Sequence, residues 1–213
     1  MTRRALSDLP LDWATEEQIA ALAPGGAGLE QRTAALAAFR ALPTESNLLF
    51  TGYVDLRAAE VERAAPAPLP QAIRSLPAAS LPAGAAALIE ITGSGVGAHL
   101  GPAATAAGLR VTPLDPSEPL PGFDGDRSAA LIAALWNAGV AIELDAGRLA
   151  APIVIRLSAP EAGSSLLARI KLHLGDGAEA AVVEEVGGGD ASSGAARSML
   201  AVSCEAELGT RST

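Results

Sequence analysis

The last third of the chain is a series of short apolar runs separated by turn residues. The runs are Val140–Leu144, Pro152–Leu157, Leu166–Leu174, Ala178–Val186 and Met199–Leu208. Each run is rich in apolar residues, most of them aliphatic, and is followed by Gly, Pro, Asp or Ser, a pattern that predicts a β-strand. A series of such strands is typical of a sandwich or a β-solenoid, in which strands stack on strands. This architecture favours a long surface for partner proteins over a deep reactive pocket.

Three other segments have the pattern of helices. Thr15 can cap a helix over residues 16–22, and a second helix is predicted over residues 29–42, where apolar residues recur at helical spacing. Asp126 can cap a third helix over Arg127–Asn137. We expect the first two helices to pack against their own domain, and the alternative is that they present a docking face to a partner.

These patterns divide the chain into three parts. Residues 1–60 form a helical N-terminal region, and residues 85–213 form a β-rich domain. Between them, residues 61–84 carry five prolines among alanines, which predicts an extended linker or a surface meander because proline lacks a backbone donor. The predicted fold class is therefore α+β, mainly β.

Composition and charge narrow the possible functions. Apolar residues make up 49% of the 213 residues but aromatic residues only 3%, so small side chains must fill most of the core. The formal net charge of −9 argues against binding to nucleic acid or to an anionic membrane, because both need clustered Lys and Arg. No apolar run approaches the roughly 18 residues of a membrane span. The single cysteine, Cys204, allows no internal disulfide, so we expect a cytoplasmic protein.

A glycine-rich segment offers a different function. Gly93, Gly95 and Ala98 follow a predicted strand and satisfy a relaxed dinucleotide-binding pattern, with Asp115 about 20 residues further on. Pro102 counts against this interpretation because it would fall inside the phosphate-binding helix. A nucleotide-binding, Rossmann-like domain using residues 93–98 is thus the alternative hypothesis, and a glycine-rich turn between two strands is the favoured one.

The candidate metal ligands lack any recognisable spacing. His99, His173 and Cys204 form neither a C-x-x-C nor an H-x-x-x-H pair, so we expect no metal site and no cofactor. Strand alternation puts His173 on the solvent side of its strand, beside Lys171. Cys204 is expected to be a buried small apolar residue.

The remaining polar residues give no sign of catalysis. Glu184 and Glu185 are neighbours in a predicted strand and must point to opposite faces, so they cannot act as paired carboxylates. The serine pairs 164–165 and 192–193 have no histidine at a fixed spacing to activate them. No nucleophile elbow, P-loop or zinc signature is present, and we expect a protein that is not an enzyme, with no catalytic, cofactor-binding or metal site.

Several short motifs in a fixed order carry a family resemblance. They begin where the third predicted helix meets the strands, and their residues are Leu135, Asn137, Ala138, Gly139, Ile142, Leu144, Gly147 and 152–155, then 168–170, 174–180 and 182–185. Looser matches lie upstream at residues 39–43 and 53–56, and a degraded one at residues 47–51. In their order these motifs resemble the SufB/SufD family, the scaffold subunits of SUF iron–sulfur cluster assembly, and are nearer to SufD.

The resemblance implies both a fold and a role. It implies a helical N-terminal region followed by the first coils of a right-handed parallel β-helix, which is truncated because only the N-terminal half of the family's length is matched. It implies a non-catalytic scaffold that acts with SufB-like and SufC-like subunits. The family's cluster-related residues have no matching positions in this sequence. We also expect the open end of the last coil to be a possible surface for self-association.

Overall fold

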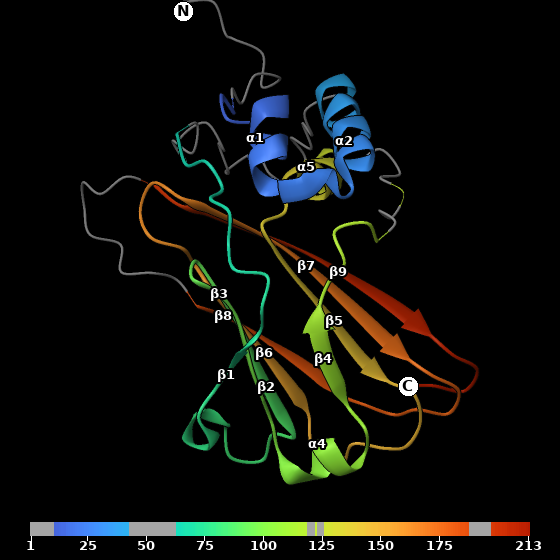
Figure 1. The fold of residues 1–213 in the computed structure, drawn as a ribbon. Helices are drawn as coiled ribbons and strands as arrows, with labels where there is room; N and C mark the ends of the chain where they lie inside the picture. The colour runs from blue at the N-terminus through green and yellow to red at the C-terminus, as the bar shows by residue number, and fades with distance from the viewer. Residues whose placement is uncertain (1–10, 43–62, 119–121, 123–125, 188–196) are drawn as a thin grey trace, which may run out of the picture.

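The fold is α+β and mainly β, with four α-helices and two mixed sheets in the part of the chain described below (Figure 1). The computed structural model describes residues 11–42, 63–118, 122, 126–187 and 197–213. The helices are α1 (Glu16–Leu22), α2 (Leu29–Ala41), α4 (Pro102–Ala106) and α5 (Arg127–Leu135), with short 3-10 turns at Pro24–Gly26 and Ala78–Ser80. The strands are β1 (Arg74–Ser75), β2 (Ala87–Thr92), β3 (Gly95–Leu100), β4 (Arg110–Pro113), β5 (Ala138–Leu144), β6 (Ile153–Ser158), β7 (Ser165–Leu174), β8 (Val182–Gly187) and β9 (Met199–Leu208).

Two of the helices, α1 and α5, begin where the sequence predicted caps. The Thr15 hydroxyl accepts a hydrogen bond from the Gln18 amide, and the Asp126 carboxylate accepts from the amides of Ser128 and Ala129. Each cap satisfies backbone donors that have no partner within the helix. None of the four helices in these residues is long and apolar enough to cross a bilayer.

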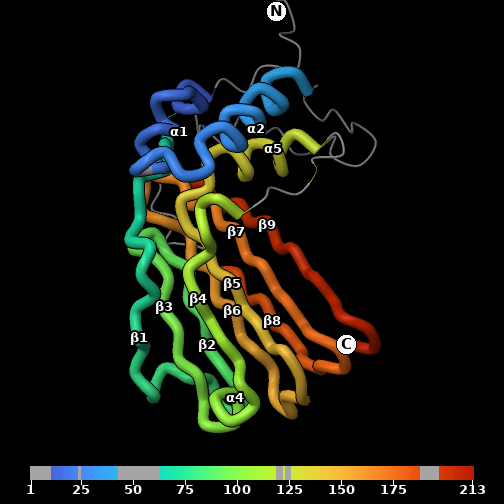
Figure 2. Tube along the Cα trace, turned by 45° about the vertical axis from the view of Figure 1, so that its right-hand side comes forward, coloured from blue at the N-terminus to red at the C-terminus, as the bar shows by residue number. Residues whose placement is uncertain are grey.

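α1, α2 and α5 form a layer at one end of the strands, and α4 lies at the other end (Figures 1 and 2). α5 follows the linker in sequence but shares a core with the N-terminal helices, which include the buried Ile19, Leu36 and Phe39. Leu167 of β7 belongs to the same core and joins this layer to the strands. The helical region is therefore assembled from two separate parts of the chain.

The strands form two sheets between which the chain alternates. One sheet has the order β4-β5-β7-β9, and the other has the order β1-β3-β2-β6-β8. From β6 onward each strand enters the opposite sheet from its predecessor. β6 pairs in parallel with β2, and β7, β8 and β9 each pair in parallel with the strand two before them. Successive coils of the chain therefore lie on one another, as the side-by-side traces of β5, β7 and β9 show (Figure 2).

The spacing between coils is regular. Paired residues lie 30, 29 and 34 positions apart in three of the parallel pairings: Ala138 with Ala168, Ile153 with Val182, and Ser165 with Met199. The main core lies between the two sheets and consists largely of β-branched and leucine side chains that alternate along each strand, among them Ile89, Val140, Ile142, Ile155 and Ile170. This alternation explains why short apolar runs predicted the strands correctly.

The turns that join the sheets also stack. The Gly175 amide donates to the Leu144 carbonyl at 2.9 Å, and the Gly209 amide donates to the Leu174 carbonyl at 2.7 Å. A side chain at Gly175 would place its Cβ 2.1 Å from the carbonyl oxygen of Asp145. Glycine is therefore required where one turn crosses closely over the turn below it.

The proline-rich segment is more than a linker over the residues described. It is extended, as predicted, but Arg74 and Ser75 form β1 and pair in parallel with β3. The Ser165 amide donates to the Ala65 carbonyl, and the Gln18 side chain donates to the Pro66 carbonyl. The segment bonds to the helical layer and to both sheets because its carbonyl groups remain acceptors even where proline removes the donors.

Candidate interaction surface

Each sheet ends in a parallel edge strand, and the two edges lie at the same end of the stack. β8 is the last strand of one sheet and β9 the last strand of the other. We call this surface the open end and define it by the inward-facing residues of the two strands. They are Val182, Glu184 and Val186 of β8 and Leu200, Val202, Cys204, Ala206 and Leu208 of β9. Unpaired strand edges are templates for further pairing.

The inward face of the stack becomes exposed at this end. Val186 is 69% exposed and Leu208 57% exposed, although both occupy the alternating positions that are buried in the preceding coils. Val186 is paired with the buried Leu157, and Leu208 with the buried Leu174. The hydrophobic pattern of the core thus continues into β8 and β9, where no described strand covers it.

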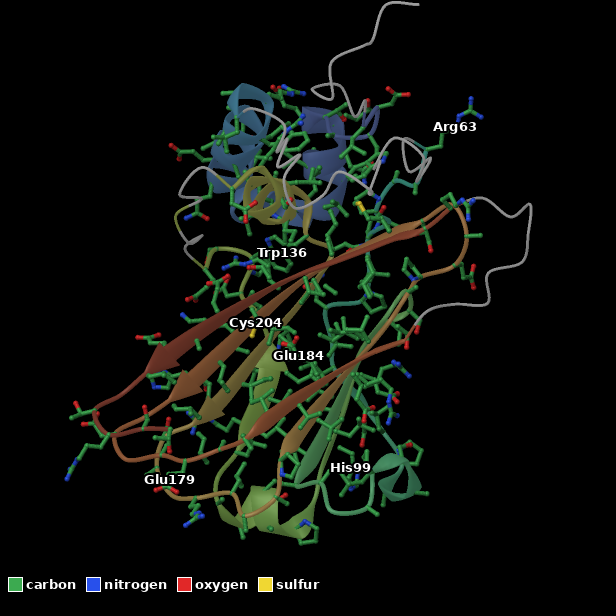
Figure 3. All side chains as sticks on the ribbon, turned by 180° about the vertical axis from the view of Figure 1, so that it is seen from behind. Arg63, His99, Trp136, Glu179, Glu184 and Cys204 are labelled. Atoms are coloured by element: carbon green, nitrogen blue, oxygen red, sulfur yellow. The ribbon has the colours of Figure 1, made fainter. Side chains whose placement is uncertain are left out.

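Two inward positions at the open end are polar. Glu184 is paired with Ile155 in one sheet, and Cys204 with Ile170 in the other. The two side chains approach one another between the sheets (Figure 3). The apolar ladders of the core therefore end in a carboxylate and a thiol that face each other.

Cys204 is exposed, contrary to the prediction that it would be buried. The prediction was wrong because strand alternation gives the face a residue occupies but cannot say whether another coil covers that face. Partial burial raises the pKa of the Cys204 thiol, and so do the charge of Glu184 and the hydrogen bond to it. The thiol is held protonated rather than activated as a nucleophile.

Charged side chains run across the outer face of the second sheet. Arg156 of β6 lies between two carboxylates, with Nη1 3.1 Å from Oε1 of Glu90 and Nε 2.9 Å from Oε2 of Glu185. The backbone register places these three residues directly beside one another on β2, β6 and β8. Their hydrogen bonds, that to Glu185 foremost, raise the pKa of Arg156. The order across the sheet is acid, base, acid.

The other sheet has a similar arrangement near its edge. Arg169 of β7 is buried and donates from Nη2 to Oε1 of Glu205 on β9 at 2.9 Å. Lys171 of β7 bonds to Glu118 and lies 3.8 Å from Glu207 of β9. The bond to Glu118 is the main cause of a raised pKa at Lys171. Cations on β7 are thus followed by carboxylates on β9.

A polar depression of about 340 Å³ lies on the outer face of this sheet. Arg110, which neighbours it, is paired with Glu143 at 3.1 Å and Asp145 at 2.7 Å, and its hydrogen bond lowers the pKa of Asp145. His173 is half exposed on this face beside Lys171, as predicted, and its Nδ1 lies 3.6 Å from Oε2 of Glu207. The cations Arg110 and Lys171 are each paired with carboxylates, and the lining contains neither serine nor cysteine.

The three candidate metal ligands are not brought together. His99 lies in β3 and its Nδ1 is 3.1 Å from the Leu76 carbonyl oxygen, far from Cys204 (Figure 3). His173 is on the outer face of its sheet, whereas Cys204 faces inward. Across the residues that the structure covers, no group of three His, Cys, Asp or Glu side chains is placed to hold a metal ion.

The glycine-rich segment forms a hairpin. β2 and β3 pair antiparallel from Ala87 with Leu100 to Thr92 with Gly95, and Gly93 lies in the turn between them. Pro102 occupies the first turn of the short helix α4, after the hairpin. A pyrophosphate site of the Rossmann type needs a helix directly after the first strand. Residues 93–98 instead form the turn and second strand of the hairpin.

The first motif residues, Leu135 and 137–139, lie where the helical layer meets the first coil. Asn137 is buried between α5 and β5, and its side chain donates to the carbonyls of Ala67 and Ser165 at 2.9 and 3.1 Å. Its Oδ1 accepts from the Leu167 amide at 2.9 Å. One side chain therefore joins the proline-rich segment, the first coil and the second coil. The upstream matches at residues 47–51 and 53–56, and the serines 192–193, lie outside the described residues.

Sequence reasoning missed the buried arginines. Arg32 and Arg169 are both less than 3% exposed, and both guanidinium groups lie near the indole ring of Trp136. Neither position differs in the sequence from an ordinary surface arginine of a helix or strand.

Comparison with known proteins gives no match: no family model fits the sequence, and no curated protein and no solved structure is significantly similar to it.

Proposed function

We propose that this protein is a non-catalytic scaffold whose open end docks another subunit. The observation that carries this proposal is the pair of parallel edges, β8 and β9, which no strand of the described residues covers and which have exposed apolar residues between them. Parallel strands are ordinarily buried on both faces and paired on both sides. Two such edges have both the backbone groups and the apolar surface needed to bind further strands.

We further propose that the stack is the first part of a right-handed parallel β-helix and that the subunit is SufD-like. The alternation of β5 to β9 between two sheets, at spacings of 29 to 34 residues, supports the first point. The order of the motifs along residues 135–185 supports the second. In this proposal the protein acts with SufB-like and SufC-like subunits in building iron–sulfur clusters, and its own residues hold no cluster.

Co-purification tests this function. The full chain, carrying an affinity tag at its N-terminus, is co-expressed with SufB-like and SufC-like proteins, and the complexes are separated by size-exclusion chromatography with light scattering. We expect a complex of defined stoichiometry in which Cys204 is protected from alkylation, because Cys204 lies at the open end. If neither protein associates with the chain, the SufD-like assignment is wrong.

A matched pair of variants locates the binding surface. Val186→Lys and Leu208→Lys place charges on the exposed apolar residues of the open end, where they should abolish binding without affecting the fold. Leu29→Lys changes another exposed leucine, at the first residue of α2 and away from the open end, and should leave binding intact. Equal loss of binding in all three variants would contradict docking at β8 and β9.

A further inference from the structure

The charged residues on the outer faces alternate in sign from one strand to the next, up to the open end. Across one sheet the order is Glu90, Arg156, Glu185, from β2 through β6 to β8. In the other sheet, Arg169 and Lys171 of β7 are followed by Glu205 and Glu207 of β9. Each described cation of these strands has its carboxylate on an adjacent strand. Both sheets therefore end in carboxylates.

This order predicts the charge of the next strand. Opposite charges on neighbouring strands stabilise a sheet, and like charges placed directly opposite destabilise it. A strand added beside β8 would meet Glu185 on its outer face, and a strand added beside β9 would meet Glu205 and Glu207. Acidic residues at these positions would be repelled, whereas Lys or Arg would continue the alternation.

The inward-facing residues of β8 and β9 predict which residues an added strand must turn inward. A strand added to either edge would have to cover Val186 or Leu208, which requires apolar residues at its inward positions. We propose that the open end binds a partner protein through strands that alternate apolar and basic residues, with the basic residues in register with Glu185, Glu205 and Glu207. This inference rests on the proposed docking role of the open end and names the chemistry of its partner.

A second copy of the chain fits this surface poorly. Joining two copies by these edges would bring together two edges that both carry outward-facing carboxylates. The net charge of −9 adds repulsion at longer range. Self-association through the open end is therefore disfavoured at neutral pH, and the partner is a different, basic chain.

The experiment uses a peptide probe and the full-length protein. The probe is a fluorescent peptide of alternating Val and Lys with the length of β9, and its control is a peptide of alternating Val and Glu. Binding is measured by fluorescence anisotropy, and contact with the open end is measured by protection of Cys204 from iodoacetamide. We expect the basic peptide to bind and to protect Cys204, and the acidic peptide to do neither.

The double variant Glu185→Gln with Glu207→Gln tests the charge pairing. Arg156 keeps Glu90 and Lys171 keeps Glu118 in this variant, so the fold should be retained. The matched control is Glu17→Gln with Glu30→Gln, which removes the same charge from exposed positions of α1 and α2. We expect the first variant to bind the basic peptide on the order of fivefold more weakly, as for two exposed ion pairs, and the control to bind it like the original protein.

The outcomes separate this inference from the proposed function. Equal binding of both peptides, or equal loss of binding in both double variants, would overturn the inference. So would a complex with a SufB-like subunit whose affinity is unchanged by Glu185→Gln with Glu207→Gln, although that result would leave the scaffold function standing. Selective binding of the basic peptide without any SufB-like complex would support the inference and remove the SufD-like assignment. Dimerisation of the free chain that masks Cys204 at neutral pH would show that a second copy is the partner instead.

Discussion

The guanidinium carbon of Arg32 lies 4.3 Å from the centroid of the Trp136 ring, and Nη1 of Arg32 donates to the Trp136 carbonyl at 2.9 Å. A second bond from Nη1 reaches the Ala134 carbonyl at 3.3 Å. One side chain of α2 therefore satisfies the carbonyls at the end of α5 and covers the indole beneath them. Burial, and then the charge of Arg169, lower the pKa of Arg32 to about 10, which still leaves it charged at neutral pH.

Arg32→Ala should destabilise the protein strongly. The substitution leaves two buried carbonyls without a donor and opens a cavity beside Trp136, so we expect the free energy of unfolding to fall by about 3 kcal/mol. Urea denaturation followed by tryptophan fluorescence measures the change. Arg148→Ala removes an arginine whose side chain is 77% exposed and should change stability by less than about 0.5 kcal/mol. A similar loss of stability in the two variants would show that Arg32 does not hold α2 and α5 together.

Asn137→Ala should also be costly. It would leave the Leu167 amide and the carbonyls of Ala67 and Ser165 without their side-chain partner, and we expect a loss of about 2–4 kcal/mol. Gln71 makes one exposed hydrogen bond to the Leu69 carbonyl, so Gln71→Ala provides the comparison. Thermal unfolding of both variants by circular dichroism checks this, and a stability for Asn137→Ala within about 0.5 kcal/mol of the original would refute it.

Gly175→Ala tests the close crossing of successive turns. Its Cβ would lie 2.1 Å from the Asp145 oxygen, so the turn would have to move, at a cost of about 1–3 kcal/mol. Gly187→Ala places its Cβ 3.7 Å from the nearest atom and should be tolerated. Denaturant unfolding of the two variants makes the comparison. The interpretation of Gly175 fails if both variants are equally stable.

The reactivity of Cys204 should depend on pH in a particular way. Because burial and Glu184 raise the pKa of the thiol, alkylation should be slower near pH 8 than for an unhindered thiol. Glu184→Gln removes the charge and should lower the pKa and speed alkylation roughly twofold or more, while partial burial continues to slow it. Mass spectrometry over a pH series gives the rates. No change in rate would mean that Glu184 does not face the thiol.

The raised pKa of the Cys204 thiol also makes the stability of the protein depend on pH. A thiol whose pKa is raised in the folded state binds its proton more tightly there than in the unfolded chain. Its contribution to the free energy of unfolding is therefore complete below the ordinary thiol pKa and is lost as the pH rises through the folded-state pKa. Comparing the original chain with Cys204→Ser at neutral and alkaline pH isolates this contribution. The difference between them should shrink as the pH rises.

Local patterns in the sequence predicted the elements well. Thr15 and Asp126 marked helix starts, and the apolar runs from Val140 onward became β5 to β9, because capping and strand alternation are properties of neighbouring residues. The strand predicted over 178–186 begins only at Val182, after a turn in which Gly177 has a φ of 69°. Such a turn depends on the stacking of the coils and not on the local apolar pattern.

What the sequence could not supply was the environment of single residues. Arg32 becomes buried only because α5, about a hundred residues later, packs over it. Cys204 has the alternation of a core residue but lies on an edge strand, and nothing local in the sequence shows whether another strand covers it. The charge order from Glu90 through Arg156 to Glu185 is likewise visible only when the register of three distant strands is known.

Within the part of the chain that the structure describes, β9 pairs along one side only, with β7. In a parallel strand, the amides of alternate residues point to opposite sides, so half of those in β9 donate into the sheet and the other half face away from it. Along β9, slowly exchanging amide hydrogens should therefore alternate with rapidly exchanging ones. When a partner's strand accepts hydrogen bonds from the amides that face away from the sheet, those amides should exchange slowly as well, and the alternation should disappear.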